Sequence, residues 1–187
     1  MTVTTRADEW EGLLSLEERE WVGGYKSWSE NINRFIKGLP LDLMVDGPTP
    51  TLEAITHIDN AINKFQLEAA TSVYCGVGYG RHVRQCIECG VYRYRGFISC
   101  SAREDVTGSF IKLDTADPVL LQFELPAGFP CAPLFSLRGA DGGEREYLLG
   151  RELVFRVQSS RCRDAAELWP PLRGKAHRLE HFILSPI

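Results

Sequence analysis

Two glutamates one residue apart, Glu144 and Glu146, stand directly before the apolar run Tyr147-Leu148-Leu149 and after a glycine-rich loop, Gly139 to Gly143. A strand does not need carboxylates at its start. A reaction that develops positive charge on its substrate while a nucleophile gives up a proton has a use for both carboxylates. In a chain that is 25% charged, such a pair also arises by chance as a solvated turn. The pair alone leaves both interpretations open.

Two upstream segments must be read with these glutamates, Val73-Tyr74-Cys75-Gly76 and Gly96-Phe97-Ile98-Ser99-Cys100-Ser101. Ser101 opens a capping-box pattern with Glu104, which predicts that its hydroxyl caps a short helix. For Ser99, a site role and a structural role remain equally open.

In this order and spacing the three segments resemble the arginine-specific mono-ADP-ribosyltransferase family of R-S-E type, and in particular bacterial type III secreted effectors. That family is marked by an arginine on its first core strand, a Ser-Thr-Ser strand and a Glu-x-Glu pair after a mobile loop. The similarity in layout runs from about Leu16 to Val157, and Leu16 to Phe35 resembles the helical lobe that covers the family's site. The resemblance implies an α+β class: an ADP-ribosyltransferase-like fold of two packed, mainly antiparallel β-sheets with an N-terminal helical lobe.

The resemblance also implies roles for individual residues. Glu146 would bond the ribose 2'-hydroxyl of NAD, the co-substrate, and stabilise the oxocarbenium-like charge that forms as nicotinamide leaves. Glu144 would take the proton that an acceptor arginine must lose, and Ser99 would hold Glu146 in position. The cofactor-binding positions it implies are Cys75, Gly76, Ser99, Phe110 and Arg81.

Cys75 departs from the family, because it occupies the position of the motif arginine. A thiol cannot supply charge-assisted hydrogen bonds, which contribute about 1.5 to 3 kcal/mol each, so NAD binding should weaken. Three hypotheses remain. Arg81 or Arg84 restores the cation and the transferase is active; the site is a relic that binds a protein or peptide without catalysis; or Cys75 is itself a nucleophile, with His82 as the nearest candidate base.

The composition limits the classes of partner. With 187 residues, a net charge of -4 and no long apolar run, the chain is expected to bind neither nucleic acid nor membrane and to be a monomer without a metal. Six cysteines in a chain of this size are expected to be reduced thiols in a cytosol. Cys86 and Cys89 have a spacing typical of two metal ligands, and His177 and His181 are the nearest candidates for the other two. Ordinary loop and core roles are favoured for these residues.

The N-terminus lacks the apolar core of a secretory signal. Together with the resemblance, this predicts a protein that is cytosolic when folded, or that enters a host cell by a route independent of a signal peptide. There it would act on a target protein.

The expected elements follow from caps and periodicity. One helix is predicted from Ser15 toward Val22, where Gly23-Gly24 should break it, and a second over about 29–37. A third follows a Thr51 cap, with one apolar stripe: Leu52, Ile55, Ile58, Ile62 and Phe65. Strands are predicted over 72–76, 96–99, 119–125, 146–149, 153–158 and 181–184. We expect one domain over 1–187, with a helical lobe at about 15–70 and a β-rich core at 71–187.

Overall fold

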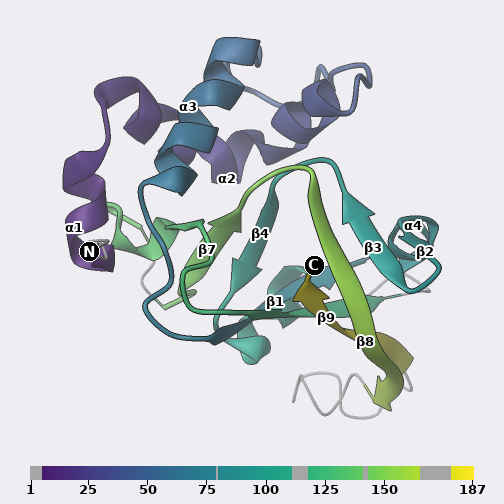
Figure 1. The fold of residues 1–187 in the computed structure, drawn as a ribbon. Coiled ribbons are helices and arrows are strands. Elements are labelled where there is room, and N and C mark those ends of the chain that lie inside the picture. Colours follow the sequence, from purple (N-terminus) through teal and green to yellow (C-terminus); the bar gives the residue numbers. More distant parts are fainter. Residues whose placement is uncertain (1–5, 79, 111–117, 141–142, 165–177) are drawn as a thin grey trace. The chain divides into compact units, whose positions relative to one another are not determined.

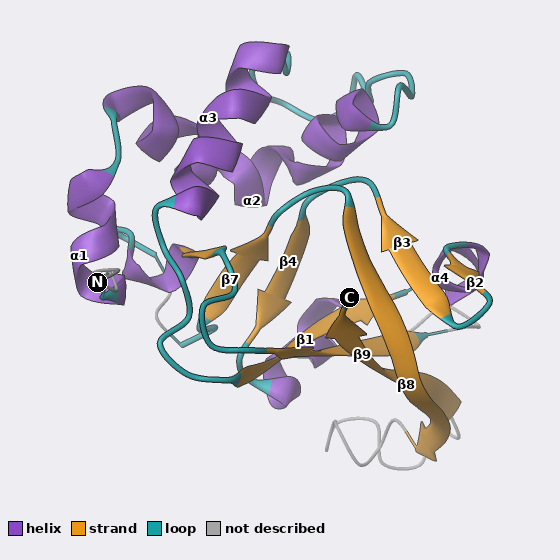
Figure 2. Ribbon diagram, in the orientation of Figure 1, coloured by secondary structure: helices purple, strands orange, loops and turns teal. Residues whose placement is uncertain are grey.

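A computed structural model describes residues 6–78, 80–110, 118–140, 143–164 and 178–187, apart from the side chains of Ser109 and Phe110. The chain divides into two compact units, each of them built from separated stretches (Figures 1 and 2). The first unit comprises Met1–Ala69, Tyr94–Ser99 and Ala127–Glu152. The second comprises Ala70–Arg93, Cys100–Pro126 and Leu153–Ile187. The prediction of a single domain stays a prediction.

The first unit contains the N-terminal helices. They are α1 (Ala7–Trp10), the 3-10 helix η1 (Glu11–Leu13), α2 (Leu16–Ile36) and α3 (Leu52–Asn63). The predicted capping box starts α2: the Glu18 amide donates to Ser15 Oγ over 3.2 Å, and the Ser15 amide donates to Glu18 Oε2 over 2.7 Å. These bonds satisfy amides that have no partner within the helix.

The expected break at Gly23-Gly24 is wrong, because α2 continues through both glycines. A glycine inside a helix costs about 1 kcal/mol relative to alanine. Burial of Val22, Tyr25 and Ile32 along the same helix offsets that cost. Gly24 is also required sterically, since a Cβ there would lie 2.1 Å from the Trp28 ring.

Helix α3 begins as predicted, with the Ala54 amide donating to Thr51 Oγ1 over 3.1 Å. Its apolar stripe is buried at four of the five expected positions, Ile55, Ile58, Ile62 and Phe65. Leu52 is the exception, since 77% of it is exposed. It is the first residue of the helix and precedes the turn that packs.

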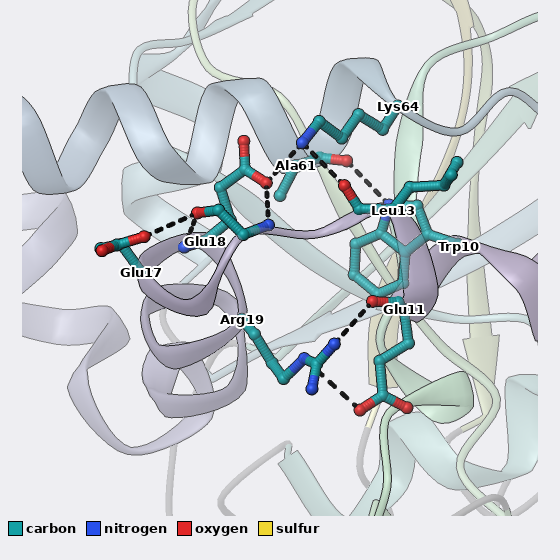
Figure 3. A network of polar contacts seen from close by, with 9 residues as sticks. Trp10, Glu11, Leu13, Glu17, Glu18, Arg19, Ala61 and Lys64 are labelled. Atoms are coloured by element: carbon teal, nitrogen blue, oxygen red, sulfur yellow. Dashed lines mark hydrogen bonds and ion pairs between the residues drawn. The ribbon is translucent and has the colours of Figure 1, made fainter.

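A polar network joins these helices within the first unit (Figure 3). The Trp10 indole donates to the Ala61 carbonyl over 2.8 Å. Lys64 Nζ donates to Glu18 Oε2 over 2.6 Å and to the Leu13 carbonyl over 2.9 Å. Glu18 is buried, so a lysine partner and hydrogen bonds compensate its desolvated charge.

Strands β6 (Cys131–Pro133) and β7 (Glu146–Leu149) complete the first unit, with the short 3-10 helix η3 (Leu134–Ser136) after β6. They pair antiparallel, Cys131 opposite Leu149 and Pro133 opposite Tyr147. Strand β4 (Ile98–Ser101) neighbours β7 in the order of hydrogen-bonded strands. It begins in the first unit and ends in the second.

The second unit is mainly strands. Its elements are β1 (Thr71–Val77), α4 (Gly80–Gln85), β2 (Ile87–Glu88), β3 (Val91–Tyr94), the 3-10 helix η2 (Glu104–Phe110), β5 (Val119–Leu125), β8 (Leu153–Asp164) and β9 (Arg178–Pro186). The strand order is β2-β3-β8-β9-β5-β1-β4. The described pairs are antiparallel except β5 with β9, which run parallel. The predicted α+β class is confirmed, whereas the described strands form a single hydrogen-bonded order instead of the two packed sheets that were expected.

All six predicted strands are present, and β5 and β7 have the predicted limits. Strand β4 starts at Ile98 rather than Gly96, and the short strands β2, β3 and β6 were not predicted. The capped helix expected after Ser101 is instead the 3-10 helix η2, and the Ser101 hydroxyl accepts from the Arg103 amide over 2.9 Å. No helix in the described part of the chain has both the length and the apolar content to cross a membrane.

Candidate active site

Ser99 and Glu146 are hydrogen-bonded in the first unit, where β4 and β7 are neighbouring strands (Figure 1). The Ser99 hydroxyl donates to Glu146 Oε1. Both side chains are half-buried, so the carboxylate is partly shielded from water and remains accessible. The structure thus brings together the two residues that were expected to act as anchor and support.

Burial raises the pKa of Glu146 above its ordinary value of 4.5. The bond from Ser99 opposes this shift, because it stabilises the ionised form, and the charge of Lys26 does the same. The nearby charge of Glu144 acts in the opposite sense. The site therefore contains a carboxylate whose pKa is raised mainly by burial and held down by one hydroxyl and one ammonium group.

Glu144 forms an ion pair with Lys26 of helix α2. The Lys26 side chain is 51% exposed and the Glu144 side chain 24% exposed, so solvent still reaches the pair. Lys26 was not singled out from the sequence. Its one signal was its place in the helical stretch that resembles the lobe over the family's site.

Arg145, between the two glutamates, has a φ of 44°. A non-glycine residue in this left-handed region is uncommon and costs about 1 to 3 kcal/mol. Its guanidinium lies 6.0 Å from the centroid of the Phe135 ring, which packs edge-on against Tyr147 with 5.2 Å between ring centroids. The backbone at the glutamate pair therefore departs from a regular strand and is fixed by side-chain contacts.

Asn33 links helix α2 to the chain that leads into Ser99. The Phe97 amide donates to Asn33 Oδ1 over 2.8 Å, and Asn33 Nδ2 donates to the Phe97 carbonyl over 3.2 Å. The Tyr25 hydroxyl also donates to that carbonyl, over 3.2 Å. A Cβ at Gly96 would lie 2.4 Å from Asn33 Oδ1, so glycine is required for this close approach.

The aromatic residues of α2 divide into two groups. Tyr25 is 1% exposed and belongs to the core. Trp21 and Trp28 are half-buried and pack edge-on, with 5.6 Å between ring centroids.

Cys75, Gly76 and Arg81 belong to the second unit, and the side chain of Phe110 lies outside the described residues. Cys75 and Gly76 are consecutive in β1, and both are half-buried. Arg81 is exposed on α4. Arg84 of the same helix forms an ion pair with Glu180 at 2.8 Å, so restoring the cation from Arg84 would require breaking that pair. His82 is exposed on this helix as well.

The residues considered for a metal do not assemble in the described part of the chain. No group of three or more His, Cys, Asp or Glu side chains there is arranged to hold an ion. Cys86 is half-buried, Cys89 is exposed, and His177 lies outside the described residues. His181 is buried in β9, with its Nδ1 3.3 Å from Arg163 Nη1.

A family model described as ADP-ribosyltransferase exoenzyme matches residues 4–168. Comparison with curated protein sequences gives no match. The structure resembles Plx2a, an ADP-ribosyltransferase toxin from Paenibacillus larvae, with a TM-score of 0.69 and 15% identity over 97% of this chain and 90% of that chain.

Two further solved structures are similar. The ADP-ribosylating toxin BECa of a Clostridium perfringens binary enterotoxin, solved with NADH, has a TM-score of 0.70 and 14% identity, over 95% of this chain and 45% of that chain. Exoenzyme S from Pseudomonas aeruginosa, solved with human 14-3-3 protein beta and carba-NAD, has a TM-score of 0.65 and 16% identity, over 96% of this chain and 78% of that chain. At these identities the likeness shows the fold.

Proposed function

Because this chain belongs to the ADP-ribosyltransferase exoenzyme family, we propose that it transfers ADP-ribose from NAD to an arginine of a target protein. The observation that carries the proposal is the bond from Ser99 to Glu146, together with the Lys26–Glu144 pair two residues away along the chain. A carboxylate for the ribose and a carboxylate for the acceptor thus occur together in the first unit.

Glu146 is the ribose anchor in this proposal. Cleavage of the bond between ribose and nicotinamide develops positive charge on the sugar, and a fixed carboxylate stabilises that charge more in the transition state than in the ground state. The Ser99 hydroxyl occupies one carboxylate oxygen, Oε1, which leaves Oε2 to accept from the ribose 2'-hydroxyl. Ser99 is therefore a positioning residue.

Glu144 is the acceptor base. The acceptor arginine is cationic at neutral pH and must lose a proton as its nitrogen attacks the ribose carbon. The ion pair with Lys26 supports this role, because the Glu144 carboxylate already contacts a cationic nitrogen. The incoming guanidinium would share the carboxylate with Lys26, which holds that carboxylate in place.

The second candidate function is binding of a protein or peptide without catalysis, and Cys75 favours it. No cation replaces the motif arginine at that position, and Arg84 is paired with Glu180. Weak NAD affinity would follow from the lost charge-assisted bonds. The target is proposed to be a host protein. Supporting this, the similar structures include bacterial toxins, and exoenzyme S was solved with a human protein.

The test compares Glu146→Gln and Glu144→Gln with the unchanged chain. Nicotinamide release from NAD is measured alone and with agmatine, whose guanidinium mimics the acceptor. Glu146→Gln should abolish both activities, whereas Glu144→Gln should lose transfer to agmatine and keep hydrolysis. Glu152→Gln, an exposed glutamate of the same unit paired with Arg95, is the matched control.

Calorimetry separates the two candidate functions. Heat of NAD binding at sub-millimolar NAD concentration supports the transferase. This heat should be lost when excess nicotinamide and ADP-ribose are added. Folded protein that releases no nicotinamide and shows no heat of NAD binding supports the non-catalytic module. Equal activity in the two glutamate variants would contradict the assigned roles.

A further inference from the structure

Cys75 and Cys100 face one another on adjacent strands of the second unit. Strands β1 and β4 run antiparallel with Tyr74 opposite Ser101, and Cys75 and Cys100 are the next residues along the two strands when this register is continued. Residues directly opposite in an antiparallel pair have their Cα atoms about 4.5 to 5.5 Å apart and their side chains on the same face. Disulfides span Cα separations of about 4.4 to 6.8 Å, so residues that continue this register have a spacing that a disulfide can bridge.

The two thiols already interact. A hydrogen bond from Cys100 lowers the pKa of Cys75, because it stabilises the thiolate more than the thiol. Cys75 is half-buried, whereas Cys100 is 2% exposed. Cys75 is thus the more exposed residue of the two.

The buried Cys131 shows the opposite environment. It is 0% exposed, and burial raises its pKa to about 12, so it should stay protonated and unreactive. Cys89 and Cys162 are exposed and represent solvent-accessible thiols. The chain thus contains an inert thiol and two exposed thiols as internal references for the facing pair.

We propose that Cys75 and Cys100 form a thiol modification site, which a low-molecular-weight disulfide such as oxidised glutathione converts into a reversible cross-strand disulfide. The Cys75 thiolate attacks one glutathione sulfur, which forms a mixed disulfide and releases one glutathione thiolate. The Cys100 thiol then loses its proton and attacks the Cys75 sulfur, which releases the second thiolate. Two protein thiols are oxidised, and one small disulfide is reduced to two thiols. The proposal does not depend on NAD cleavage.

Peptide mapping tests the link directly. Cleavage after lysine and arginine places Cys75 alone in the peptide 65–81 and Cys100 alone in the peptide 96–103, while Cys86 and Cys89 share the peptide 85–93. The full chain is incubated with oxidised glutathione, its free thiols are alkylated, and the digest is analysed by mass spectrometry without reductant. A peptide joining 65–81 to 96–103, released by dithiothreitol, is expected.

Two variants test the order of attack. In Cys100→Ser, Cys75 should stop at the mixed disulfide with glutathione, because the resolving thiol is absent. In Cys75→Ser, the buried Cys100 should stay reduced. Cys162, isolated and exposed, should take glutathione in every variant. The proposal is overturned if Cys75 of the unchanged chain carries glutathione or stays alkylatable while peptide 96–103 remains free.

A second readout, thermal unfolding, compares the unchanged chain with Cys75→Ser. Oxidation should raise the thermal midpoint of the unchanged chain, because a cross-link restricts the unfolded chain. The same treatment should leave the midpoint of Cys75→Ser unchanged. An equal shift in both proteins would assign the effect to another cysteine and overturn the proposal.

Discussion

Lys26 and Glu144 form an ion pair across 118 positions of the chain, and through it helix α2 contacts the carboxylate that we propose as the acceptor base. Replacing the lysine by Lys26→Met should reduce transfer to agmatine by about 2- to 5-fold, since an exposed pair is worth about 0.2 to 1 kcal/mol. Lys26→Arg should keep most of the activity. Transfer is measured against NAD hydrolysis, which should change less.

The control for this prediction is Lys37→Met. Lys37 follows the last residue of the same helix and donates to the Tyr94 hydroxyl over 3.1 Å. If Lys37→Met lowered transfer as much as Lys26→Met, the effect would belong to the helix and not to the ion pair.

Ser99→Ala should move the acid limb of NAD cleavage to higher pH. In its proposed role Glu146 must be ionised. Burial raises the pKa of Glu146 above 4.5, so activity should be lost as the pH falls through this raised pKa. The Ser99 bond opposes the shift, and its removal should raise the pKa further. We expect a loss of about 10-fold or more in kcat at neutral pH, consistent with about 1.5 to 3 kcal/mol for a bond to a charged group.

Ser99→Thr retains a hydroxyl and should restore most of the rate and the position of the limb. The pH profile of kcat distinguishes this positioning role from a loss of folding, which would lower the rate equally at every pH. An acid limb that does not move in Ser99→Ala would contradict the proposed support of Glu146.

The fold and the glutamate pair were predictable because they depend on local patterns. The Ser15 and Thr51 caps, the strands β5 and β7 and the order of the three motifs all follow from residues close together in sequence. Continuity of α2 through Gly23-Gly24 was not predictable, since it depends on tertiary packing that outweighs helix propensity. The exposed Leu52 was missed because periodicity alone does not show where burial begins.

The partners of the site residues were less accessible to sequence reasoning. Lys26 reaches Glu144, and Asn33 reaches Phe97, across long separations that no local pattern encodes. The register that sets Cys75 opposite Cys100 likewise depends on strand pairing, which the sequence did not specify. Residue types indicated the candidate side chains for the chemistry, whereas only the structure showed which side chains contact them.

Asn33→Ala should lower the free energy of unfolding by about 1 to 3 kcal/mol, because it leaves the Phe97 amide without this acceptor. Urea unfolding followed by circular dichroism measures the change. Asn60→Ala, at an exposed position of α3, is the control and should have a small effect. A change in Asn33→Ala no larger than in the control would show that Phe97 is held by other contacts.

Stability should fall with acid because of His181. This histidine is 1% exposed, its Nε2 has no hydrogen-bond partner among the described residues, and burial lowers its pKa to about 4. The charges of Arg163 and Arg161 lower the pKa further, and that of Glu104 opposes them.

In the unfolded chain the histidine has a pKa of about 6.5, so it binds a proton at a pH where the folded chain keeps His181 neutral. The contribution of neutral His181 to the free energy of unfolding is therefore complete at pH 8 and is lost as the pH falls. Linkage gives a loss of about 2 kcal/mol between pH 8 and pH 5. His181→Leu should remove this part of the decline, and the exposed His82→Leu should keep it. Urea unfolding at both pH values measures the difference, and parallel declines in the two variants would show that His181 is not the group that titrates.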